Sequence, residues 1–174
     1  MGAGKMTVAI TDAGPLVHLN EISCLVLLRI FDTLHIPDAV WSETVGQKRV
    51  FECDVLDLSI VRRHNLLPTK VAQFTRENGL DDLHDGEREC LFLCQRLDVS
   101  ILLTDDLAVR EQSRRLNLTP VGSLGVVVRA FHQGQISLSD AERHIANLYD
   151  VSSLFVTQAI VELAIEQLHK QPRP

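Results

Sequence analysis

The sequence predicts an α/β domain in which a parallel β-sheet is covered by helices on both faces. Short apolar runs rich in β-branched residues alternate along the chain with longer segments of helical periodicity, and this alternation is typical of parallel sheets. The chain has 174 residues, of which 45% are hydrophobic, and this suffices for one domain with a complete core. No internal repeat, low-complexity tract or linker divides the sequence.

The first strand is expected to be central in the sheet because it is short, apolar and β-branched. It begins at Val8 and ends at Asp12, where Gly14 and Pro15 stop the strand and turn the chain into a helix. Apolar spacing over residues 16–30 predicts one or two helices that cover the sheet. Ligands bind at the carboxyl ends of the strands in such sheets, so Asp12 lies where a site is expected.

The remaining elements follow from the same periodicity and from signals that start and stop helices and strands. Later strands are expected over residues 34–36, 55–61, 99–103 and 119–122. Later helices are expected over residues 37–45, 71–77, 85–97, 107–116, 124–131, 139–148 and 153–170. Ser139 and Glu142 have the spacing of a capping box at the start of the penultimate helix.

Charge and cysteine content narrow the class of protein. The net charge of −6 argues against a protein that binds nucleic acid by charge alone. It does not exclude a nuclease, because a cluster of metal-binding carboxylates would itself add negative charge. No apolar run reaches the ~20 residues that span a membrane, and the N-terminus lacks the apolar core of a signal peptide. Cys24, Cys53, Cys90 and Cys94 form no Cys-x-x-Cys pair, which predicts buried, reduced thiols and a cytoplasmic location.

Acidic residues follow or flank the carboxyl ends of several predicted strands. They are Asp12, Glu43, Glu87, Asp105 and Asp106. In a parallel sheet these segments meet at one edge, where close carboxylates repel one another by a few kcal/mol per pair at an effective dielectric of ~20. Protonation or a cation relieves that repulsion. Mg²⁺ and Mn²⁺ prefer carboxylate oxygen, and a metal so held can activate water next to a phosphate.

Each of these residues also has a purely structural interpretation. Glu87 can stabilise a helix N-terminus through the macrodipole, and Asp105 or Asp106 can be an N-cap. Asp106 can also pair with Arg110 one helical turn later, and Glu43 can be a solvated helix residue. Asp12 is the strongest functional candidate, because a cap on the following helix would more often come after the glycine; Asp85 reads as a cap rather than a ligand.

Four segments together resemble the PIN-domain family. They are Thr-Asp-Ala-Gly-Pro-Leu (11–16), Ile-Pro-Asp-Ala-Val-Trp-Ser-Glu (36–43), Asp-Gly-Glu-Arg-Glu-Cys (85–90) and Leu-Leu-Thr-Asp-Asp-Leu-Ala-Val-Arg (102–110). Their order and spacing fit, and the match spans residues 7 to about 132. The chain is most similar to the prokaryotic branch of PIN-like proteins related to VapC toxins, and the tail from Gly134 is similar to that branch as well.

The resemblance implies a three-layer sandwich with a five-stranded parallel sheet, formed by residues 1–174 as a single PIN-like domain with 134–174 as a helical extension. It implies Mg²⁺- or Mn²⁺-dependent hydrolysis of phosphodiester bonds, usually in RNA. Carried over by position, the catalytic quartet is Asp12, Glu43, Glu87 and Asp105, and the metal ligands are Asp12, Glu87, Asp105 and Asp106. The doubled aspartate leaves open which of Asp105 and Asp106 is the main fourth ligand.

The resemblance also bears on substrate and partners. Thr104, Arg88 and Arg110 are expected to bind the substrate; the Thr104 hydroxyl can orient water or an acidic neighbour, or it can be a turn residue. RNA would need positive charge beside the acidic edge, and the candidates are Lys48, Arg49, Arg62, Arg63, Arg88 and Arg110. No aromatic stacking platform is evident, since Trp41 reads as core. VapC-like proteins imply a homodimer and a small antitoxin; the alternative is a non-catalytic scaffold that binds RNA or a protein.

Overall fold

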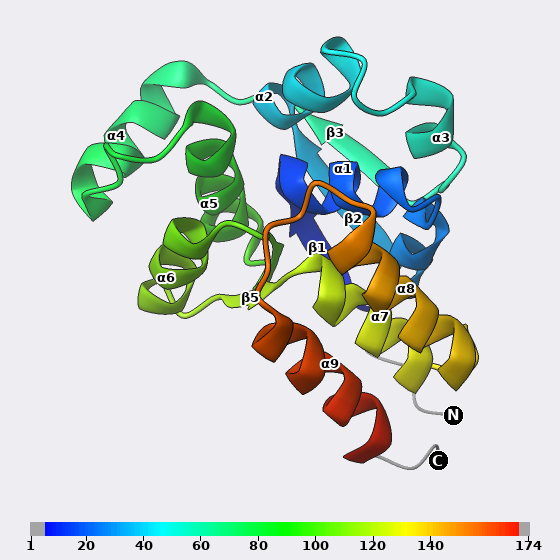
Figure 1. The fold of residues 1–174 in the computed structure, drawn as a ribbon. Helices are drawn as coiled ribbons and strands as arrows, with labels where there is room; N and C mark the ends of the chain where they lie inside the picture. The colour runs from blue at the N-terminus through cyan, green and yellow to red at the C-terminus, as the bar shows by residue number, and fades with distance from the viewer. Residues whose placement is uncertain (1–5, 171–174) are drawn as a thin grey trace, which may run out of the picture.

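The central feature of the computed structural model, which describes residues 6–170, is a five-stranded sheet in the order β3-β2-β1-β4-β5 (Figure 1). Its strands are β1 (Val8–Thr11), β2 (Thr33–Pro37), β3 (Val61–His64), β4 (Ile101–Leu103) and β5 (Thr119–Val121). Every pairing between neighbouring strands is parallel. The predicted α/β class and the parallel five-stranded sheet are therefore confirmed.

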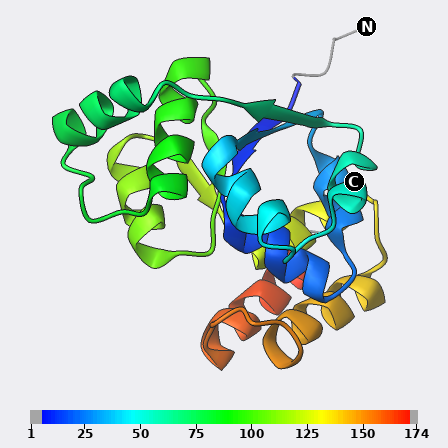
Figure 2. The same ribbon diagram turned by 90° about the horizontal axis from the view of Figure 1, so that it is seen from above.

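Helices form the outer layers of the sandwich. They are α1 (Ala13–Glu21), η1 (Leu25–Ile30), α2 (Asp38–Trp41), η2 (Ser42–Gly46), α3 (Glu52–Leu56), α4 (Pro68–Asn78), α5 (Asp85–Leu97), α6 (Leu107–Arg115), α7 (Ser123–His132), α8 (Leu138–Asp150) and α9 (Gln158–Lys170). Helix α5 lies along β2, β1 and β4, with α4 beside it, whereas α1 packs against α7. Figures 1 and 2 show α8 and α9 on the outside of α7, away from α4 and α5.

The core centres on β1 and β4, which are covered on both faces. Ile10, Leu102 and Leu103 have no exposed surface, which explains why these strands read as continuous apolar runs rather than alternating ones. Helices α8 and α9 extend the same apolar core with residues such as Ile145 and Leu168. The assignment of residues 1–174 to one domain stays a prediction.

The expected strand over residues 55–61 is wrong in its position. Residues 52–56 form helix α3, and the strand β3 begins only at Val61. Val55 and Leu58 are three residues apart and both buried, as on one face of a helical turn, and not alternately buried as in a strand. Strand β3 lies at the edge of the sheet and exposes Arg62 and Arg63, so its sequence lacks the apolar signal of a central strand.

The start of α8 also differs from the sequence prediction. The cap is Ser137, whose hydroxyl accepts a hydrogen bond from Asp140 N at 3.0 Å, rather than Ser139 with Glu142. The two serines have the same spacing to an acidic residue, so sequence pattern alone does not separate them.

The last helix begins later than expected, at Gln158 instead of residue 153. Ser153 instead forms hydrogen bonds to Glu21 of α1, which hold residues 151–157 in a loop.

Two further results concern the cysteines and the length of the helices. Cys53 is exposed, contrary to expectation, whereas Cys24, Cys90 and Cys94 are buried free thiols. Within residues 6–170, every helix is too short or too polar to cross a lipid bilayer.

Candidate active site

Asp12 lies at the carboxyl end of the central strand β1 and is the N-cap of α1. Its Oδ1 accepts a hydrogen bond of 2.8 Å from Ala13 N, and the residue is 7% exposed. The helix therefore starts directly after Asp12, and the expectation that a cap would come after the glycine is wrong. Gly14 and Pro15 belong to the first turn, where a proline is tolerated because the missing N–H has no helical partner.

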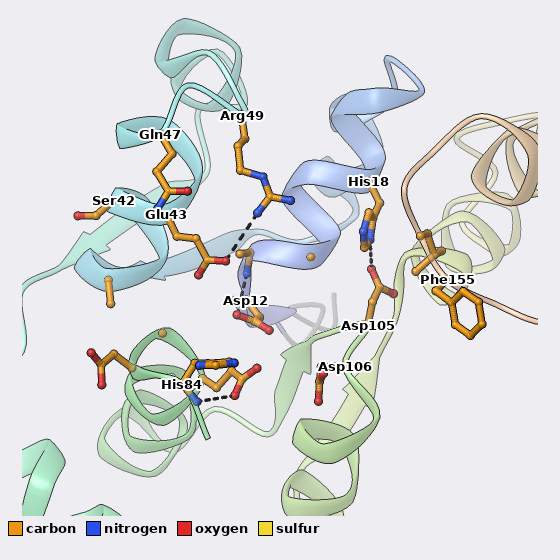
Figure 3. Close-up of a pocket in the computed structure, with 17 residues that line it drawn as sticks. Asp12, His18, Ser42, Glu43, Gln47, Arg49, His84, Asp105, Asp106 and Phe155 are labelled. Carbon is orange, nitrogen blue, oxygen red and sulfur yellow. Dashed lines mark hydrogen bonds and ion pairs between the residues drawn. The ribbon is translucent and has the colours of Figure 1, made fainter. Parts of the chain in front are cut away.

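The predicted acidic residues line one cavity at the carboxyl edge of the sheet. The cavity has a volume of about 740 Å³ and its walls include Asp12, Glu43, Glu87, Asp105 and Asp106 (Figure 3). These side chains come from the end of β1, the π-helical turn η2, the first turn of α5 and the connection between β4 and α6. The topology thus brings together segments that are far apart in the sequence.

Burial and neighbouring charge make Asp12 difficult to ionise. Burial is the main cause that raises its pKa from 3.8 to about 7, and the negative charges of Glu87 and Glu43 raise it further. Hydrogen bonds from Ala13 N and the Thr104 hydroxyl act in the opposite direction. Burial likewise raises the pKa of Glu87, and the charges of Asp106 and Glu43 add to this effect. The four carboxylates therefore interact as one group.

Glu87 and Glu43 line the same cavity, and Glu43 is near enough to raise the pKa of Glu87. Glu87 Oε2 accepts a hydrogen bond of 2.8 Å from His84 N and so also closes the start of α5. Gly86 lets the start of α5 pack closely on α2, because a Cβ there would lie 3.3 Å from Val40 Cγ2, a tight contact. Glu43 forms an ion pair with Arg49 at 3.7 Å between Oε1 and Nη1.

Asp105 is turned away from Asp12 and is held by other groups. Its Oδ2 lies 2.8 Å from His18 Nδ1 (Figure 3). The same Oδ2 accepts a hydrogen bond from Ser123 Oγ at 2.6 Å, and Oδ1 accepts one from Ser123 N at 2.7 Å. Gly122 is required for this packing, since a Cβ there would be only 2.8 Å from Asp105 Oδ1. Both oxygens of Asp105 are therefore engaged with the protein.

Asp106 keeps one oxygen free of the protein. Its Oδ1 caps α6 by accepting a hydrogen bond of 3.0 Å from Val109 N. Among the described residues, no hydrogen bond reaches its Oδ2, and the residue lines the cavity close enough to Glu87 to raise the pKa of that glutamate. The predicted N-cap role thus belongs to Asp106 and leaves a carboxylate oxygen for the cavity.

A family model described as a PIN domain matches residues 8–170. This chain belongs to the PIN-domain family. The match extends through α8 and the whole of α9, and family membership indicates a nuclease-type fold. The relation to the VapC branch stays a prediction. A search of curated proteins found no match.

The three residues predicted to bind substrate in this PIN domain lie in different places around the cavity, and their role in binding stays a prediction. Thr104 has no exposed surface, and its hydroxyl donates to Asp12 Oδ2 at 3.2 Å, so it contacts an acidic neighbour rather than a ligand. Arg88 bonds to the Asp81 carbonyl at 2.6 Å and lies outside the cavity wall. Arg110 donates to the Thr104 carbonyl at 3.1 Å and lines an adjoining groove.

Sequence reasoning missed His18 and Phe155, which also line the cavity of this PIN domain. His18 lies on α1, and its link to Asp105 joins residues 87 positions apart, so no local pattern could indicate it. The sequence predicts Phe155 within the last helix, over residues 153–170, but it lies in the loop before α9 and is 93% exposed. Arg49 was among the candidate basic residues and does line the cavity.

The donor set of the cavity suits a hard divalent cation. Asp12 carries no ion pair with a lysine, arginine or histidine within residues 6–170, and carboxylate oxygen is the ligand that Mg²⁺ and Mn²⁺ prefer. In the same part of the chain, no three Asp, Glu, His or Cys side chains are placed as metal ligands would be. The helix caps and ion pairs described above hold several of these carboxylates against the protein instead.

Proposed function

We propose that this PIN domain hydrolyses phosphodiester bonds of RNA in the acidic cavity, with Mg²⁺ or Mn²⁺ as cofactor. The observation that carries the proposal is the convergence of acidic side chains from four segments around the buried Asp12, whose pKa is raised to about 7. The helix caps that some of these carboxylates form do not require them to share one cavity, where burial and mutual repulsion both destabilise the ionised forms. A cation that balances the charge removes that cost.

In this proposal Asp12, Glu43, Glu87 and Asp106 hold the metal. When bound, Mg²⁺ or Mn²⁺ supplies an activated water and stabilises the negative charge that develops on the phosphate. Asp106 is preferred to Asp105 as the fourth ligand because one of its oxygens has no protein partner among the described residues, whereas both oxygens of Asp105 are occupied.

The other polar groups of the cavity have supporting roles. The Thr104 hydroxyl orients the Asp12 carboxylate, and Asp105 fixes the ring of His18 at the cavity wall. Arg49 contributes positive charge beside Glu43, where it can bind a substrate phosphate. A toxin role, a small antitoxin and a homodimer remain predictions that rest on the resemblance alone.

The test is cleavage of single-stranded RNA by the purified protein with Mn²⁺, with and without EDTA. We expect cleavage by the wild type only, abolished by the chelator and by Asp12→Asn. Asp57→Asn is the matched control, because Asp57 is an exposed acid outside the cavity. If Asp12→Asn cuts as fast as the wild type, the activity belongs to another site or to a contaminant. RNA binding without cleavage would support the non-catalytic scaffold.

Metal binding is tested separately by calorimetry with Mn²⁺. Glu87→Gln removes the charge but keeps an oxygen that can accept from His84 N, so the start of α5 is preserved. We expect weaker Mn²⁺ binding by this variant. Unchanged affinity would remove Glu87 from the metal site and leave it only its helix-capping role.

A further inference from the structure

Phe155 is an exposed aromatic ring at the rim of the acidic cavity. It is 93% exposed, although apolar surface of this size is normally covered in a folded protein. The residue lines two neighbouring cavities at once, the acidic cavity and a second groove between α6, β5, α7 and α9. Asp105, Leu154 and Phe155 line both, so the two cavities adjoin each other at this ring.

The loop that carries Phe155 is fixed to the rest of the protein. Ser153 N and Oγ donate hydrogen bonds of 2.7 and 2.8 Å to the carboxylate of Glu21 on α1. Ser152 Oγ donates to the Leu148 carbonyl at 2.6 Å, and Leu154 is 7% exposed. The ring is therefore presented by an anchored segment, with its neighbour Leu154 buried and Phe155 itself directed to solvent (Figure 3).

The second groove combines apolar surface with positive charge. It has a volume of about 470 Å³, and its apolar walls include Leu107, which is 77% exposed, and Ile160. Arg110 and Arg129 also line it, and Arg129 has no ion pair within residues 6–170. Cationic groups with flat apolar surface suit a single-stranded polynucleotide, whose phosphates are negative and whose bases stack.

We propose that Phe155 is a stacking platform for an unpaired nucleobase, and that the strand runs from the acidic cavity across this ring into the groove with Arg110 and Arg129. The inference rests on the proposed nuclease function and adds a base-binding subsite to it. Stacking needs a base that is free of its partner, so this subsite selects single-stranded over duplex substrate.

The experiment measures binding of a labelled single-stranded oligoribonucleotide by fluorescence polarisation, in the Asp12→Asn background so that no substrate is cut. We expect Phe155→Ala to weaken binding by about 5- to 150-fold, the range of one base–aromatic stack. Phe155→Leu keeps apolar bulk without a ring and should resemble Ala, whereas Phe155→Trp should restore binding. Phe51→Ala is the control, because Phe51 is 68% exposed and lines neither cavity.

A second arm scans one abasic nucleotide along the oligonucleotide. At one position the abasic nucleotide should weaken binding to the protein that retains Phe155. At the same position it should have no effect on binding to the Phe155→Ala variant. Equal RNA affinities for all Phe155 variants would overturn the proposal. It would also be overturned if Phe155→Ala weakened binding and Phe155→Leu bound as tightly as the parent, because apolar bulk without a ring would then suffice. A Phe155→Ala change that alters only self-association assigns the ring to a protein interface, and absence of RNA binding also rejects the subsite.

The outcomes also separate this inference from the nuclease proposal. Metal-dependent cleavage by the wild type, with Phe155 variants that bind and cut normally, rejects only the stacking role. Ring-dependent binding of single strands without any metal-dependent cleavage rejects only the nuclease.

Discussion

Thr104 and Asp12 are joined by a hydrogen bond of 3.2 Å from the threonine hydroxyl to Oδ2 of the aspartate. The same hydroxyl oxygen accepts a hydrogen bond from Asp106 N, also at 3.2 Å. Thr104 therefore links the start of α6 to the carboxylate at the end of β1. Because Thr104 is fully buried, neither bond can be replaced by water without moving the main chain.

Thr104→Val should reduce both stability and activity while keeping the shape of the side chain. It leaves Asp106 N without its buried acceptor, which costs about 1–3 kcal/mol in the free energy of unfolding. It also removes the hydrogen bond that lowers the pKa of Asp12 and orients its carboxylate, so RNA cleavage should fall by roughly 10- to 100-fold. Thr104→Ser keeps the hydroxyl, so it should retain most of the stability and most of the cleavage activity. Equal activity of Thr104→Val and the wild type would contradict the positioning role.

Asp105 and Asp106 should respond differently to the same substitution. Asn is as good an N-cap as Asp, so Asp106→Asn keeps the cap on α6 and removes only the charge. We expect it to weaken Mn²⁺ binding by at least about tenfold, or ~1.4 kcal/mol. Asp105→Asn should change metal affinity little and instead lower the melting temperature, since its oxygens bond to Ser123 and His18. Calorimetry on both variants decides the assignment, and the reverse order of affinities would make Asp105 the ligand.

The fold was largely predictable because its central strands have a strong sequence signal. Ile10 and Leu102 are fully buried, and the apolar runs around them identified β1 and β4 without any tertiary information. Strand β3 was misplaced because it lies at the edge of the sheet, where Arg62 and Arg63 face solvent. Hydrophobic periodicity in a sequence arises from burial, so an edge strand whose side chains face solvent shows little of it.

The site was predictable where the order of elements and the parallel topology decide the position of a residue. Asp12 directly follows β1 and Asp105 comes two residues after the end of β4, so the parallel topology brings them to one edge. The partner of Asp105 was not predictable, because His18 reaches it through the packing of α1 beside the end of β4. Phe155 has the spacing of a core residue in a helix, and only the anchored loop reveals that its ring is exposed.

Metal-free stability should depend on pH through Asp12. The native state raises its pKa from 3.8 to about 7, so the folded protein binds this proton more tightly than the unfolded chain does. This contribution is fully present below pH ~4 and is lost as pH rises to about 7, by an amount on the order of a few kcal/mol. In EDTA the wild type should therefore be destabilised between pH 4 and 7 relative to Asp12→Asn, as measured by urea unfolding.

Added Mn²⁺ should reverse the trend for the wild type, because the metal binds only the ionised carboxylate of the folded state. Asp12→Asn should gain much less stability from the metal. Parallel pH profiles of the two proteins in EDTA would show that the Asp12 pKa is not raised in the folded protein.

Arg49 should contribute to RNA binding through its charge, in contrast to Phe155. It lines the acidic cavity beside Glu43, and its side chain is 43% exposed, so a phosphate can reach it. In the Asp12→Asn background, Arg49→Ala should weaken binding of single-stranded RNA and reduce the slope of log K against log salt by about 1. Arg62→Ala is the matched control, because Arg62 is an exposed arginine on β3 that does not line the cavity, and its slope should equal that of the parent.

Phe155→Ala does not change the charge, so it should lower RNA affinity at every salt concentration without altering the slope. Equal slopes for the Arg49 and Arg62 variants would exclude a phosphate contact at Arg49 and leave that residue only its ion pair with Glu43.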